Sequence, residues 1–136
     1  MLITHLFPGE REFVARTRAT LNYLGATELA AYVLQRGALT EVAVATSRGL
    51  VRLRRQPDTV HGAPQFVVES EVFPWIDVRG LRVRTHSMVD ADRTEVISVD
   101  FRLDHPNIGF SSSAARAGEQ ADFVAACLDL MAHQGR

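Results

Sequence analysis

The sequence contains no lysine, so all fifteen of its basic residues are arginine. Sixteen acidic residues offset them and the formal net charge is −1. Such a balance gives the molecule as a whole no electrostatic attraction for nucleic acid or for an anionic membrane. We therefore expect no nucleic-acid partner, and peripheral contact with a membrane surface stays open only through a local cluster of arginines.

Cysteine and long apolar runs are scarce as well. Cys127 is the single cysteine and has no internal partner for a disulfide, which is compatible with a reducing compartment. The first residues lack the basic and apolar regions of a signal peptide, and no segment reaches the roughly 18 apolar residues of a membrane span. We expect a cytoplasmic location and no transmembrane segment.

The 136 residues, 46% of them hydrophobic, suit one globular domain over residues 1–136. Residues 8–37 are expected to form a helical hairpin. Phe13, Val14 and Leu21 recur at helical spacing and Gly25 ends the first helix, while Thr27 is the expected N-cap of a second helix that ends at Gly37.

After Thr40 the apolar period changes from 3.6 to 2, which predicts strands. The expected strands cover residues 42–46, 50–55, 66–72, 75–78, 81–85 and beyond, 95–103, and 108–111. From residue 114 the helical period returns, and one stripe predicts an amphipathic C-terminal helix: Phe123, Ala126, Cys127, Leu130 and Met131.

Three segments resemble bacterial pleckstrin-homology-like (PH-like) domains: 42–53 (VAVATSRGLVRL), 72–78 (VFPWIDV) and 121–128 (ADFVAACL). The resemblance implies an α+β fold, an antiparallel seven-strand sandwich or partly open barrel over residues 39–134 with a C-terminal capping helix. The helical hairpin would precede this core. The implied function is a non-enzymatic interaction or scaffolding module that binds a protein partner without a cofactor. Phosphoinositide-binding members use a long basic loop between their first two strands, whereas the corresponding turn here is Ser47-Arg48-Gly49.

Outward-facing arginines on two expected strands form a candidate anion-binding face. Arg52 and Arg54 alternate with Val51 and Leu53, and Arg82 and Arg84 alternate with Leu81 and Val83. With Arg48 in the turn, the candidate residues are Arg48, Arg52, Arg54, Arg82 and Arg84. The alternative is that these arginines face solvent and pair with Glu69, Glu71 or Glu95 across the ladder.

No constellation of catalytic or metal-binding residues is recognisable. The five histidines have no paired spacing, and Asp104-His105 with Ser111, Ser112 and Ser113 lacks the strained turn that exposes a nucleophilic serine. We expect neither catalysis nor a metal.

The expected hairpin carries more apolar surface than one packing contact absorbs. Tyr23, Leu29, Tyr32 and Val33 are therefore candidate interface residues for a homodimer or a protein partner. An alternative class is a small-molecule pocket protein or enzyme of the NTF2-like kind, which also begins with helices but usually ends on a strand.

Overall fold

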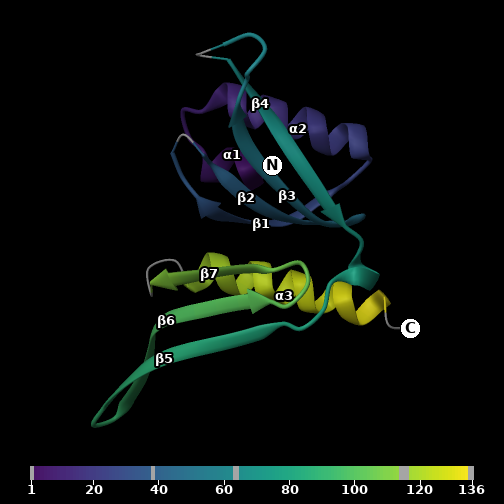
Figure 1. Cartoon of the computed structure of the whole chain (residues 1–136). Helices are drawn as coiled ribbons and strands as arrows, with labels where there is room; N and C mark the ends of the chain where they lie inside the picture. Colours follow the sequence, from purple (N-terminus) through teal and green to yellow (C-terminus); the bar gives the residue numbers. More distant parts are fainter. Residues whose placement is uncertain (1, 38, 63–64, 114–116, 135–136) are drawn as a thin grey trace. The chain divides into compact units, whose positions relative to one another are not determined.

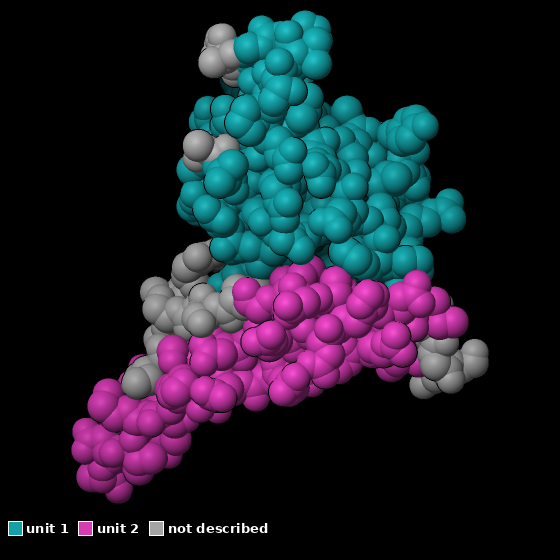
Figure 2. Space-filling view, viewed as in Figure 1, with its two compact units in different colours: residues 1–74 teal, residues 75–136 magenta. Residues whose placement is uncertain are grey.

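The computed structural model describes residues 2–37, 39–62, 65–113 and 117–134. In these residues, helices and antiparallel strands form an α+β structure with two sheets and a C-terminal helix. The chain divides into two compact units, which Figure 2 colours separately: unit 1 (Met1–Pro74) and unit 2 (Trp75–Arg136). The expectation of one domain over residues 1–136 stays a prediction.

Unit 1 is a four-stranded antiparallel sheet with two helices on one face (Figure 1). Helices α1 (Leu2–Leu6) and α2 (Arg11–Leu24) precede strands β1 (Glu28–Gln35), β2 (Glu41–Thr46), β3 (Gly49–Pro57) and β4 (Phe66–Phe73). The strands lie in chain order, with α1 against β1 and α2 against β4. The core between helices and sheet comprises Ile3, Phe7, Phe13, Val14, Leu21, Val33, Val42, Val44, Val51, Leu53 and Phe66.

The expected first helix is confirmed as α2. Its apolar spacing buries Phe13, Val14 and Leu21 on one side, and the ring of Phe13 meets that of Phe7 edge to face at 4.9 Å. Gly25 ends the helix in the left-handed region at φ 65°, where a side chain is disfavoured, and donates its N–H to the Asn22 carbonyl.

The expected second helix of the 8–37 hairpin is wrong, because residues 28–35 form strand β1. Val33 lies opposite Val42 and Tyr32 opposite Ala43, so pairing with β2 places neighbouring side chains on opposite faces of the sheet. The segment 42–53 is consequently the second hairpin of the sheet and not the opening one. The loop between the first two strands is residues 36–40, with Arg36 as its one arginine.

Unit 2 is a three-stranded antiparallel sheet, β5 (Arg82–Asp90), β6 (Arg93–Leu103) and β7 (Ile108–Ser113), with helix α3 (Ala117–Gln134). The strand expected at residues 75–78 is wrong, since Trp75–Asp77 form the short 3-10 helix η1. Trp75 and Val78 lie three residues apart, and both are buried. A single turn of helix places residues at this spacing on one side, whereas a strand would place them on opposite faces.

Helix α3 covers one face of the second sheet. It contacts η1, β6 and β7, and the expected stripe is confirmed, with Phe123 and Cys127 fully buried. The ring of Phe123 meets that of Phe101 edge to face at 5.8 Å. Since successive side chains on a strand alternate, the neighbours of Phe101 on β6, Asp100 and Arg102, project from the opposite face.

Candidate anion-binding site

The candidate arginines lie on strands of two different sheets. Arg52 and Arg54 belong to β3 in unit 1, whereas Arg82 and Arg84 belong to β5 in unit 2. Sequence alternation placed each pair outward on its strand but carried no information on which strands share a sheet.

The two arginines of β3 are engaged by the largely buried carboxylate of Glu41 on β2. Arg52 Nε donates to Glu41 Oε1, and Arg54 Nε lies 3.4 Å from Glu41 Oε2. On the other side, Glu71 lies opposite Arg52 and Glu69 opposite Arg54 in the register with β4. Three carboxylates therefore border two guanidinium groups. This favours ion pairing across the ladder over anion binding as the role of Arg52 and Arg54.

Arg48 lies in the turn between β2 and β3, and its Nε donates to the Gly25 carbonyl at 3.3 Å. Thr46 Oγ1 accepts hydrogen bonds from the N–H groups of Arg48 and Gly49 at 3.1 and 3.2 Å. This local network connects the turn to the end of α2, so the contacts of Arg48 are those of a turn residue.

The second sheet brings a third arginine to Arg82 and Arg84. Arg102 on β6 lies directly opposite Arg82, and Asp100 lies opposite Arg84. Sequence reasoning missed Arg102, although its alternation with Phe101 and Leu103 was a usable signal. The sequence does not show the register of β5 with β6, and this register places Arg82 opposite Arg102.

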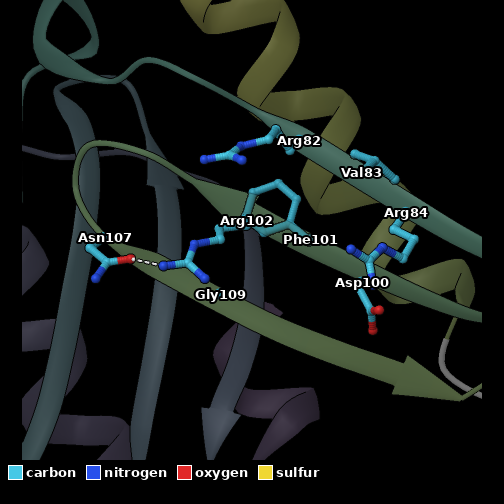
Figure 3. A pocket seen from close by; sticks show the side chains of 8 residues that line it. All are labelled: Arg82, Val83, Arg84, Asp100, Phe101, Arg102, Asn107 and Gly109. Atoms are coloured by element: carbon cyan, nitrogen blue, oxygen red, sulfur yellow. Dashed lines mark hydrogen bonds between the residues drawn. The ribbon is translucent and has the colours of Figure 1, made fainter.

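These residues border a hollow of about 950 Å³ in unit 2 (Figure 3). It is lined by Arg82, Val83, Arg84, Asp100, Phe101, Arg102, Asn107 and Gly109. Gly109 lies opposite Arg102 on β7. Because glycine has no side chain, the sheet surface beside the Arg102 guanidinium stays open.

Two polar groups hold the arginines at the margin of the hollow. Arg102 Nη2 donates to Asn107 Oδ1 at 3.1 Å, as Figure 3 shows, and Arg82 Nη2 donates to Asp104 Oδ1. Asp104 can approach because Gly80, at φ 76°, has no Cβ, which would collide with the Asp104 side chain. Each of these guanidinium groups keeps further N–H donors for another ligand.

Arg84 differs from Arg82 and Arg102 because it has neither an ion pair nor a side-chain hydrogen bond among the described residues. The carboxylate opposite it, Asp100, lies 3.4 Å from Nε2 of His86 instead. The hollow thus has three guanidinium groups and two nearby carboxylates, Asp100 and Asp104. A single phosphate or carboxylate is the ligand type that such donors hold by paired hydrogen bonds.

The four candidate interface residues have different environments. Tyr23 on α2 is 90% exposed and Leu29 on β1 is 47% exposed, whereas Tyr32 and Val33 are buried. Val33 belongs to the core of unit 1. Leu29, Tyr32 and Val33 differ in exposure because residues 28–35 form a strand, which the sequence analysis did not predict.

The remaining candidate residues form no site in the described part of the chain. Asp104 binds Arg82, and the side chains of Ser111, Ser112 and Ser113 lie outside the described ones. No group of three or more described His, Cys, Asp or Glu side chains could hold a metal ion. Cys127 is buried, and burial raises the pKa of its thiol to about 12.

No described helix combines the length and apolar character that a membrane crossing requires. In comparisons with known proteins, no family model, no curated protein and no solved structure matches this chain. The residues and their geometry therefore carry the functional argument.

Proposed function

We propose that this chain is a non-enzymatic, PH-like interaction module, and that its arginine hollow binds one anionic group presented by a protein partner. The PH-like part is supported by the order of elements, antiparallel strands in two sheets followed by a C-terminal helix. The binding part rests on the hollow of unit 2.

The observation that carries the proposal is the placement of Arg82 directly opposite Arg102. Like charges opposite each other in a ladder destabilise a sheet by roughly 0.2–1 kcal/mol. An anion between them reverses this repulsion, because both guanidinium groups can donate to its oxygens. Arg84, which has no ion-pair partner among the described residues, adds a third donor group on the same strand.

The charge balance favours one anionic group over an extended anionic surface. Asp100 and Asp104 offset two of the three arginines, and the whole chain has a net charge of −1. Electrostatic recruitment to anionic lipid typically uses clusters of about 4–8 basic residues. A phosphorylated or acidic side chain of a partner protein needs only the donors of this hollow.

The direct test is a titration followed by NMR, with blocked phosphoserine and blocked glutamate as the two probes. We expect saturable shifts at Arg84, Arg102 and Gly109, weakened by salt because the contacts are charged. The probe that binds with the higher affinity shows whether the hollow prefers a phosphate or a carboxylate. Shifts that do not saturate with either probe, or vesicles of phosphatidylserine that bind independently of Arg102, would overturn the proposal.

Two variants test whether the hollow itself is responsible. Arg102→Gln should weaken binding at least about fivefold, as expected for loss of a charged hydrogen-bond donor, whereas Arg93→Gln, on the same strand but outside the hollow, should bind as the wild type does. Gly109→Val places an isopropyl group in the part of the hollow beside Arg102 without changing the charge. A Cβ at residue 109 meets its nearest atom at 3.5 Å, an ordinary contact, so this variant should fold and fail to bind.

A further inference from the structure

Strand β5 is exposed along its whole length. All nine of its residues are exposed, including Val83 at 48%, Met88 at 56% and Val89 at 77%. It forms an edge of its sheet, since β6 separates it from β7 (Figure 1), and the main contacts of α3 with this sheet are to β6 and β7. A long edge strand with exposed apolar residues is a template for pairing with another strand.

The sequence of β5 is complementary to itself when two copies run antiparallel. With His86 opposite His86 of a second copy, Arg82 lies opposite Asp90 and Val83 opposite Val89. Thr85 then lies opposite Ser87 and Arg84 opposite Met88, so three of the four pairs that flank the axis are complementary. Opposite charges, apolar pairs and Thr–Ser pairs are the cross-strand combinations that stabilise antiparallel ladders.

We propose that two copies of this chain pair through β5 about a two-fold axis at His86, so that their three-stranded sheets join into one continuous sheet. The axis makes the interface isologous, which is the commonest arrangement in homodimers. The occupant of the exposed edge is therefore a second copy of the same strand. This surface differs from the one expected at residues 8–37.

The proposed register is the one that pairs all nine residues of β5, because His86 is the middle residue of Arg82–Asp90. The edge is also regular. The irregularity between His86 and Ser87 leaves Ile97 as the extra residue of β6, so it lies on the central strand and β5 has no inserted residue. A bulge on the edge strand itself would have opposed such pairing.

Charge reversal at the ends of β5 tests the register. We expect wild-type sedimentation to show a monomer–dimer equilibrium between about 5 and about 500 µM. Asp90→Arg and Arg82→Asp should each weaken association at least about tenfold by placing like charges opposite each other. The double variant Arg82→Asp, Asp90→Arg should restore it. Asp92→Arg, the same charge change in the neighbouring turn, is the matched control.

Cross-linking tests the position of the axis. Adjacent antiparallel strands place opposite Cα atoms about 4.5 or 5.5 Å apart, within the range of a disulfide. His86→Cys should therefore form an intermolecular disulfide under mild oxidation, whereas Tyr23→Cys, at an exposed position on α2, should not. The buried thiol of Cys127 does not compete in the folded protein.

The outcomes separate this proposal from the anion site. A wild-type monomer at about 500 µM, a loss of association in Asp92→Arg equal to that in Asp90→Arg, or a double variant that stays monomeric would overturn the β5 dimer. The titration of the hollow uses chains that retain Arg82 and is tested at Arg102 and Gly109, so these results leave it unaffected. A chain that dimerises through β5 and binds neither probe would retain this proposal and refute the proposed function.

Discussion

Truncation of Phe123 to alanine should be one of the most destabilising substitutions in unit 2. The side chain is 1% exposed, lies on the covered side of α3 and meets the ring of Phe101 at 5.8 Å. Loss of a buried phenylalanine side chain costs about 3–5 kcal/mol, because transfer free energy is lost and a cavity remains. The edge-to-face pair accounts for about 0.5–1.5 kcal/mol of this.

Urea unfolding followed by tryptophan fluorescence measures the effect on unit 2 directly. Trp75 is the single tryptophan, is buried, and lies in η1, which contacts α3. The midpoint and the slope of the transition give the free energy of unfolding. Leu128→Ala is the matched control on the same helix, because Leu128 is 49% exposed and its loss should change the free energy by no more than about 0.5 kcal/mol.

Two results would refute the reasoning. A loss below about 1 kcal/mol in Phe123→Ala, or equal losses in Phe123→Ala and Leu128→Ala, would show that α3 is peripheral to the sheet. Phe101→Ala and the double variant Phe101→Ala, Phe123→Ala complete a double-mutant cycle. A coupling free energy of about 0.5–1.5 kcal/mol is expected between the two rings, and additivity would contradict their contact.

Three further predictions concern other buried or charged groups. Thr17→Val should raise the free energy of unfolding by about 1 kcal/mol in urea titration, because the buried Thr17 hydroxyl has no hydrogen-bond partner among the described residues. Thr20→Val removes a hydrogen bond to the Arg16 carbonyl and should not raise it. Hydrogen bonds from the backbone N–H and side chain of His61 and from the Val60 N–H lower the pKa of Asp58 below 3.8. The carboxyl carbon resonance of Asp58 should therefore show its acid titration midpoint below 3.8. Cys127, with its pKa raised to about 12, should react with a thiol reagent at pH 8 only after unfolding, and protein stability should decline as the pH rises above the ordinary thiol value of 9.0.

The sequence by itself determined the elements whose periodicity is strong and local. In α2 and α3 the apolar residues recur every three or four positions, and the same side chains are buried or partly buried in the structure. In β3, Val51 and Leu53 alternate with Arg52 and Arg54, and the alternation places the valine and leucine in the core. Each pattern is set by the geometry of one element, so no distant residue is needed to interpret it.

Only the tertiary structure decided the conformation of residues 28–35 and the membership of the candidate site. Leu29, Ala30 and Val33 are compatible with a helical face, and pairing with β2 made the segment a strand. Likewise, no spacing in the sequence shows that Arg82 lies opposite Arg102, because these residues are twenty positions apart and the register of β5 with β6 brings them together. Strand pairing is a non-local interaction, and the chemistry of the hollow depends on it.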